Sequence, residues 1–114
     1  MRWMLGAVPP IAPGLFRVDF TGEIVYWRGP SPFHFVVVPE PQLGEVASWS
    51  FASYGWGCLP VEGRLGRTEF RTSLFPKDGG FVVPIKAHVR TAERVELGDV
   101  VRLRLDLVTD GITD

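Results

Sequence analysis

The stretch from Thr68 to Arg90 constrains the fold most, because it combines two strands, a tight turn and the start of a helix. Residues 68–75 alternate between two kinds of side chain, and a period of two predicts a strand with one buried face. Residues 76–80 read Pro-Lys-Asp-Gly-Gly, which predicts the turn of a hairpin, since Gly tolerates the positive φ such turns require. The strand resumes at residue 81, and Pro84 predicts its end or a place at a sheet edge because proline donates no backbone hydrogen bond.

Similar patterns predict the remaining elements. Alternating or continuous apolar runs favour strands over residues 15–27, 33–38, 58–65 and 101–107. Apolar residues at helical spacing favour short helices over residues 42–51 and 85–93. Thirteen Gly and ten Pro among 114 residues are typical of a chain with many turns and few long helices. The pattern predicts an all-β fold with one or two short helices, a small closed or split β-barrel of about six strands.

The domain plan is simple. We expect one domain over residues 15–108, preceded by an irregular Pro-rich arm over residues 1–14 and followed by a short acidic tail over residues 109–114. Proline breaks the short apolar run at the start, which disfavours a secretion signal. No run reaches the roughly 18 apolar residues of a membrane span. The single cysteine excludes an internal disulfide. These features favour a cytoplasmic protein with no membrane partner.

Charge is distributed unevenly along the chain. The formal net charge is −1, which disfavours generic binding to nucleic acid. Between Arg64 and Arg90, however, six basic residues face only Glu69 and Asp78. Two interpretations stay open: a local basic patch, or solvated strand faces, of which the second is favoured.

No familiar catalytic or metal-binding motif is present. Cys58 has no local base to activate it and is interpreted as a small core residue, although His34 or His88 could in principle reach it. The two histidines lack a nearby second ligand, so no metal site is expected. Glu62 and Glu69 could face each other across a hairpin, where neighbouring arginines would favour solvated ion pairs over a general acid. We therefore predict no catalytic residue, no metal and no cofactor.

Several motifs together resemble a known bacterial family. They are Trp27-Arg28-Gly29-Pro30, Phe35-Val36-Val37-Val38-Pro39, Gly55-Trp56-Gly57, Arg71-Thr72-Ser73-Leu74-Phe75-Pro76, Gly80-Phe81-Val82-Val83-Pro84-Ile85-Lys86, Val89-Arg90 and Gly98-Asp99. In this order they resemble the family of domain of unknown function 1905, over roughly Leu15 to Val108. Phe33 and Phe70 depart from it, since the family often has Trp there. The arm before Leu15 is extra, and a carboxy-terminal segment of some members is absent.

The resemblance implies a six-to-seven-stranded double-split β-barrel, similar in fold to AbrB-type regulators and MazE-type antitoxins. It implies no activity, because fold likeness does not carry function and the family has no settled one.

The residues themselves suggest a ligand site. An apolar pocket with a few polar groups is how small ligands are usually held. The candidate ligand-binding residues are Trp27, Arg28, His34, Trp56, Arg71, Ser73, Lys86 and Arg90. The Arg71/Ser73 strand face and the aromatics near Trp27 and Trp56 would hold the ligand. The alternative for the polar residues, weighed equally, is ion pairing with Glu69, Glu93 or Asp99.

Three functional hypotheses follow. The first is a binding or interaction module for a small or anionic ligand. The second is a dimeric AbrB-like DNA-binding regulator or antitoxin, with Arg64, Arg67, Arg71, Lys86 and Arg90 on phosphates. The third is a small barrel enzyme of the cyclase or isomerase type. In each case we expect a homodimer, because small barrels of this kind often share strands or edges.

Overall fold

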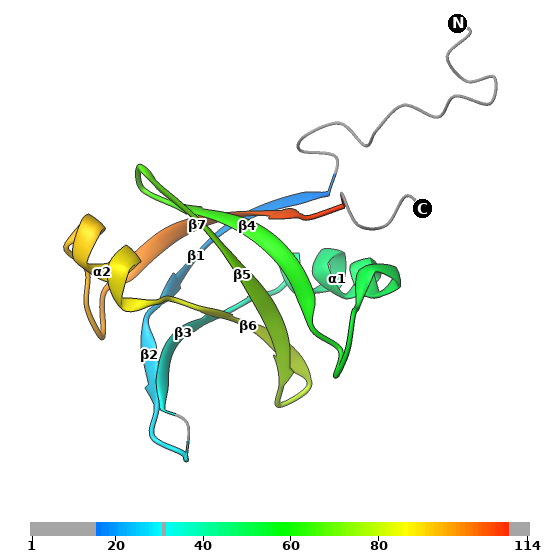
Figure 1. Ribbon diagram of the computed structural model, residues 1–114, viewed down its shortest axis with the longest axis horizontal. Coiled ribbons are helices and arrows are strands. Elements are labelled where there is room, and N and C mark those ends of the chain that lie inside the picture. Colours follow the sequence, from blue (N-terminus) through cyan, green and yellow to red (C-terminus); the bar gives the residue numbers. More distant parts are fainter. Residues whose placement is uncertain (1–15, 31, 110–114) are drawn as a thin grey trace, which may run out of the picture.

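The computed structural model describes residues 16–30 and 32–109, so the predicted arm and almost the whole predicted tail lie outside the described residues. Seven antiparallel strands form one curled sheet in the order β1-β7-β4-β5-β6-β3-β2 (Figure 1). The strands are β1 (Arg17–Glu23), β2 (Val25–Trp27), β3 (Phe33–Val37), β4 (Leu59–Leu65), β5 (Thr68–Lys77), β6 (Gly80–Pro84) and β7 (Val100–Leu107). The helices are α1 (Gln42–Ala47), continued by a 3-10 turn η1 (Ser48–Ala52), and α2 (Ala87–Glu93). The predicted all-β, barrel-like fold with short helices is confirmed.

The sheet curls because residues 17–27, one continuous stretch of chain, form the strands at both of its edges. Strands β1 and β2 are separated only by Ile24, yet they lie at opposite ends of the strand order. At this corner Ile24 N donates to Asp99 O at 2.9 Å, and Gly98 N donates to Ile24 O at 2.9 Å. A Cβ on Gly22 would lie 2.5 Å from Val36 Cγ1, so the missing side chain lets β1 pass close to β3. Gly22 would be the expected break in the strand predicted over residues 15–27, but the strand is divided at Ile24, into β1 and β2.

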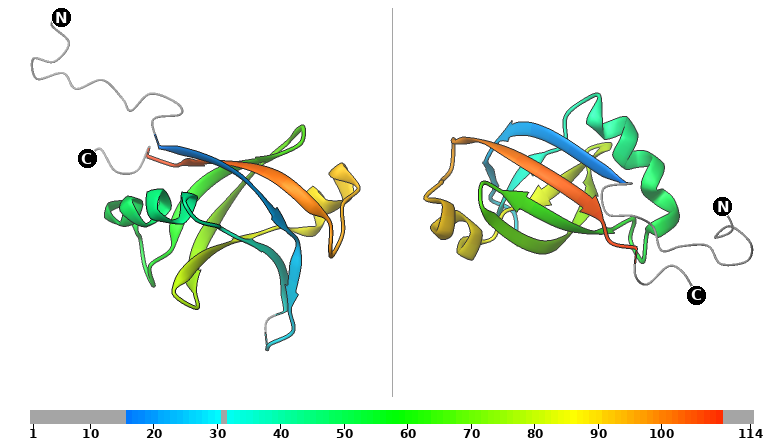
Figure 2. Two further views of the ribbon diagram at one scale, coloured as in Figure 1. Left: turned by 180° about the vertical axis from the view of Figure 1, so that it is seen from behind. Right: turned by 90° about the horizontal axis from the view of Figure 1, so that it is seen from above.

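The core fills the inside of the curl. Alternate side chains of the strands point inward, and Leu59, Leu74, Leu103 and Leu105 are fully buried. Helix α1 and its 3-10 extension add Trp49, also fully buried, while α2 adds Val89. Figure 2 shows the two helices at opposite ends of the curled sheet. Ile85, Val89 and Ala92 lie at helical spacing and would form the apolar stripe of the second helix, but Ala92 is exposed, because only the face carrying Val89 meets the core.

The central hairpin is tighter than predicted. Asp78 and Gly79 have φ of 52° and 80°, so the turn has two residues and the strands continue to Lys77 and from Gly80. This fixes the register in which Phe75 lies opposite Val82. The continuous apolar run over residues 33–38 predicts a strand covered on both faces, and this is wrong at Val37, whose side chain is 51% exposed.

Helix length bears on the membrane question. The longest helix in residues 16–30 and 32–109 is α2, with seven residues. No helix in these ranges has the length and hydropathy to cross a bilayer.

Candidate ligand-binding pocket

A pocket of about 480 Å³ lies where the β2–β3 hairpin meets the connection from β6 to α2. Pro84 ends β6, and the next residue, Ile85, donates its backbone N–H to His34 O at 2.9 Å. This bond holds the start of α2 beside β3. The pocket, called here the His34 pocket, is lined by Tyr26, Pro32, Phe33, His34, Phe75, Pro84, Ile85, Lys86, Ala87 and Arg90.

Three of its polar side chains can carry positive charge. Lys86 directly precedes α2, and Arg90 lies one turn further along the helix. The Nη1 of Arg90 donates to Ile85 O at 2.6 Å, which anchors the guanidinium at the pocket. Burial and then the positive charge of Arg90 lower the pKa of His34 from its ordinary value. His34 is therefore a neutral hydrogen-bonding group at neutral pH, in a lining that also includes Lys86 and Arg90.

Three aromatic residues, Tyr26, Phe33 and Phe75, also line the pocket. The Phe33 ring centre lies 5.2 Å from that of Phe75 and 5.0 Å from that of Phe35. The Tyr26 ring centre lies 4.8 Å from that of His34. These distances are typical of packed aromatic pairs. The pocket thus offers flat apolar surface next to cationic groups.

The predicted ligand residues divide into two groups. His34, Lys86 and Arg90 line the pocket together, and Arg28 lies nearby, with its guanidinium carbon 5.9 Å from the Tyr26 ring centre. Trp27 is not part of the pocket lining, and its ring centre lies 5.8 Å from that of Phe33.

The other predicted residues lie outside this pocket. Arg71 contacts Glu62 at 2.7 Å, and the Ser73 hydroxyl bonds to that of Tyr54. Trp56 is 96% exposed in the loop before β4. The structure therefore does not bring Arg71, Ser73 and Trp56 to the same site as His34.

Sequence reasoning missed Phe75 and Pro84. Both lie on the outer face of the sheet, as Phe33 and Phe35 do. The Asp78-Gly79 turn could have indicated the position of Phe75. A two-residue turn places Phe75 opposite Val82, so that these two side chains lie on the same face of the sheet. That Phe33 lies within ring contact of Phe75 depends on pairing between distant strands, which no local pattern indicates.

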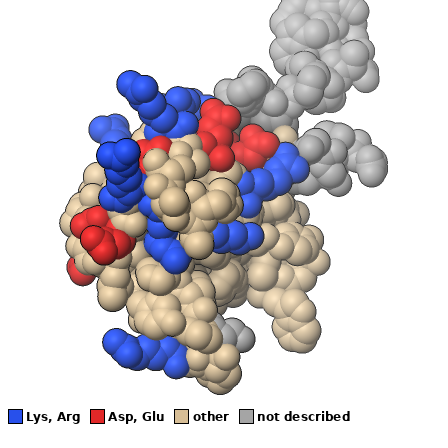
Figure 3. Space-filling model, turned by 60° about the vertical axis from the view of Figure 1, so that its left-hand side comes forward, with Lys and Arg blue, Asp and Glu red and all other residues tan. Residues whose placement is uncertain are grey.

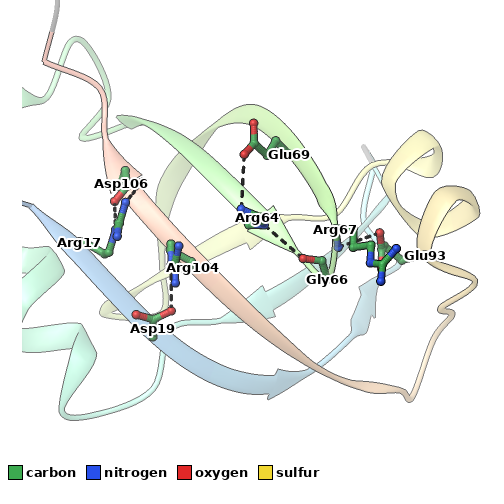
Figure 4. A network of polar contacts seen from close by, with 9 residues as sticks. All are labelled: Arg17, Asp19, Arg64, Gly66, Arg67, Glu69, Glu93, Arg104 and Asp106. Carbon is green, nitrogen blue, oxygen red and sulfur yellow. Dashed lines mark hydrogen bonds and ion pairs between the residues drawn. The ribbon is translucent and has the colours of Figure 1, made fainter. Parts of the chain in front are cut away.

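A second hollow, of about 340 Å³, lies over the outer face of strands β1, β7, β4 and β5. Arg17 contacts Asp106 at 2.6 Å, Arg104 contacts Asp19 at 3.4 Å, and Arg64 contacts Glu69 at 3.6 Å (Figure 4). The charged face is defined here as Arg17, Asp19, Glu62, Arg64, Glu69, Arg71, Arg104 and Asp106. Seen from the side, the molecule carries basic and acidic groups together in its upper part and few charges below (Figure 3).

These ion pairs correct one expectation and confirm another. Glu62 and Glu69 do not face each other, because the register of β4 and β5 places Glu62 opposite Arg71 and Arg64 opposite Glu69. The interpretation of these carboxylates as members of solvated ion pairs is confirmed. Near the same face, Glu93 of α2 accepts a hydrogen bond from Arg67 N at 3.2 Å, which ties the helix to the β4–β5 turn.

Comparison with known protein families identifies the family to which this chain is similar. The family described as Domain of unknown function (DUF1905) matches residues 20–105, which include every strand from β2 to β6 and most of β1 and β7. No curated protein matches the chain. The match covers well over half of the 114 residues, and the chain belongs to the DUF1905 family.

Proposed function

We propose that this protein is a binding module for a small anionic molecule with a flat apolar part, held in the His34 pocket. The observation that carries the proposal is the makeup of the lining: Lys86, Arg90 and His34 stand beside aromatic rings, and no Asp or Glu is among the described residues that line it. A volume of about 480 Å³ falls within the range of about 300–1,000 Å³ for small-molecule sites.

The charges favour an anion over a neutral ligand. Two cations without an acidic neighbour in the lining repel each other, and a carboxylate or phosphate between them would offset that repulsion. Arg90 already donates a hydrogen bond to Ile85 O, so its side chain loses little conformational entropy when a ligand binds to it. The rings of Phe33 and Phe75 would pack against the apolar part, which confers a preference for flat molecules.

An NMR titration tests this proposal. Benzoate and benzamide have the same shape, and only benzoate is charged. We expect benzoate to shift the amide signals of residues 33–35 and 85–90, and benzamide to bind more weakly at the same place. Lys86→Gln should weaken benzoate binding, whereas Lys77→Gln should not, because Lys77 lies 4.5 Å from the Trp27 ring and outside the pocket lining. Equal binding of both probes, or signal shifts confined to another surface, would refute the proposal.

The DNA-binding hypothesis has less support. Arg64 and Arg71 each contact a carboxylate, which lowers the positive charge they would offer to phosphates. Lys86 and Arg90 line the pocket instead of sharing the outer face of β4 and β5. A DNA affinity that falls steeply with added salt would nevertheless favour this second hypothesis.

The enzyme hypothesis is narrowed in one respect. A substrate enclosed within the barrel would have to replace core side chains, since Trp49, Leu74 and Leu103 are fully buried inside the curl. Any reaction would therefore have to take place in a surface pocket such as the His34 pocket.

A further inference from the structure

The charged face consists of two rows of side chains that cross four strands. The register pairs Arg17 with Asp106, Asp106 with Glu62, and Glu62 with Arg71. Two residues further along each strand it pairs Asp19 with Arg104, Arg104 with Arg64, and Arg64 with Glu69. In strand order, the Arg17 row therefore has signs plus, minus, minus, plus, and the Asp19 row has minus, plus, plus, minus.

Each central charge of the two rows has its ion-pair partner on one side only. The ion pairs join β1 to β7 and β4 to β5, which leaves like charges opposite each other between β7 and β4. Asp106 stands opposite Glu62, and Arg104 stands opposite Arg64. Like charges directly opposite on neighbouring strands are destabilising. A partner with the inverse pattern would remove this repulsion.

The inverse pattern is present on the same face, because each row is the charge inverse of the other. We propose that the charged face binds a second copy of itself across a two-fold axis that runs perpendicular to the strands, between the two rows. This axis places the Arg17 row of one copy over the Asp19 row of the other. Arg17 then faces Asp19 of the second copy, and Glu62 faces Arg64 of the second copy. All of the facing charges are opposite in sign.

The pattern also selects this axis. Each row reads the same in both directions, so a two-fold axis along the strands would place every charge over a like charge. Both axes bring the same patch of the two copies together, as a symmetric dimer requires, but only the axis between the rows places opposite charges over each other. The strands of the two copies would run antiparallel to each other across the interface.

The size of the face limits its strength. Four strands at about 4.8 Å spacing and two rows about 6.6 Å apart make a small patch. Small interfaces belong to the weak and transient class, and exposed charges are screened by salt. The side chains are from 29% to 77% exposed, so they are available to a second copy. We therefore expect a weak dimer that is favoured at low ionic strength. This inference does not depend on the proposed ligand pocket.

Sedimentation of the full chain with paired charge reversals tests the proposal. E62R/R71E reverses one ion pair of the Arg17 row and keeps it paired within the subunit, but it brings like charges together across the interface. We expect this variant to raise the dimer dissociation constant at least about tenfold. R64E/E69R should do the same from the Asp19 row. Mixed together, the two variants become complementary again and should form a heterodimer.

The mixture excludes loss of folding as an explanation, because misfolded subunits would not restore each other. The fourfold variant E62R/R64E/E69R/R71E should dimerise with itself but not with wild-type protein. Wild-type protein that stays monomeric at about 0.01 M salt, where screening extends over about 30 Å, would overturn the proposal. So would a wild-type dimer that E62R/R71E leaves unchanged, since the dimer would then use another surface or a bound polyanion.

Discussion

The outer surface of the sheet differs between its two halves. Strands β1, β7 and β4, with the first part of β5, carry the charged face. Strands β2, β3 and β6, with the last part of β5, carry an aromatic face, defined here as Trp27, Phe33, Phe35, Val37, Phe75 and Val82. Both halves bury their inward side chains in the same core. One alternating pattern thus builds the fold in both halves, and the outward residues distinguish them.

The two halves differ in the kind of contact that their outer side chains can make. The charged face pairs all eight of its charges, within β1 and β7 or within β4 and β5, and places like charges opposite each other between β7 and β4. The aromatic face leaves Trp27 37% exposed and Val37 51% exposed, and the His34 pocket opens at its margin. The contacts on the charged face are ion pairs, and those on the aromatic face are packed rings beside cationic groups.

The largest effect should come from the inner faces, where the halves do not differ. Leu103 is an inward-pointing residue of β7, in the charged half, and Ile85 directly follows β6, in the aromatic half. Their exposed fractions are 0% and 1%. Replacing either by Ala should lower the free energy of unfolding by about 2–5 kcal/mol, through lost burial and the cavity left behind. Urea unfolding followed by circular dichroism measures this.

Two further results would bear on that prediction. Val100→Ala is the control, because Val100 is 70% exposed and its loss should change stability by less than about 0.5 kcal/mol. If Leu103→Ala unfolded the charged half while ring signals of the aromatic half persisted, the halves would not share one cooperative core.

The next effect concerns the place where the halves join. A Cβ added at Gly22 would lie 2.5 Å from Cγ1 of the fully buried Val36 and force β1 away from β3. Gly22→Ala should therefore destabilise the protein by about 1–3 kcal/mol, the usual cost of overpacking. Thermal unfolding of the variant measures the change.

Gly44→Ala is the matched control for Gly22→Ala. Apart from its chain neighbours and the backbone of its own helix, no atom of the described residues lies within 4 Å of the position its Cβ would take, and Gly44 is inside α1. This substitution should stabilise the helix by up to about 1 kcal/mol. Equal effects of the two substitutions would mean that Gly22 is not a close-approach position.

A smaller effect on stability should come from the titration of His34, which lies in the aromatic half. The pKa of His34 is lowered in the folded protein by burial and by Arg90, so between that pKa and the ordinary value of about 6.5 the unfolded chain binds more protons. Stability should therefore fall as pH decreases through about 6.5 and level off below the folded pKa. Tyr26, Lys86 and Arg90 surround His34, and none of them is a carboxylate that would reverse this sign.

His34→Gln isolates the contribution of the histidine. The difference in free energy of unfolding between wild type and this variant should depend on pH in the direction given above, measured by urea unfolding from pH 7.5 to pH 5. Benzoate bound in the pocket should oppose the effect, because a negative charge favours protonated His34. A difference that does not change with pH would show that His34 does not titrate abnormally.

Local sequence patterns were sufficient for the inner faces of the strands. Alternation over residues 68–75 and 101–107 predicted which side chains are buried, because period two is a property of the strand itself. The charged face was not predictable as a surface, since it requires β7 to pair with both β1 and β4. Likewise, His34 meets Lys86 and Arg90 only because Ile85 pairs with His34 across half the chain. The sequence therefore did not predict which distant strands pair and in what register, and this limited the prediction more than the residue types did.

The smallest effects compare one pair from each face and respond differently to salt. Glu62 and Arg71 contact at 2.7 Å but are 59% and 60% exposed, so a double-mutant cycle to Gln should give a coupling of about 0.2–1 kcal/mol. The Phe33–Phe75 pair, with ring centres 5.2 Å apart, should give about 0.5–1.5 kcal/mol in a cycle to Leu. Raising the salt concentration should reduce the first coupling and leave the second unchanged, because ions screen charges and do not screen ring contacts. Measured by urea unfolding of monomeric protein at two salt concentrations, a salt-sensitive aromatic coupling would contradict the division into an electrostatic half and an aromatic half.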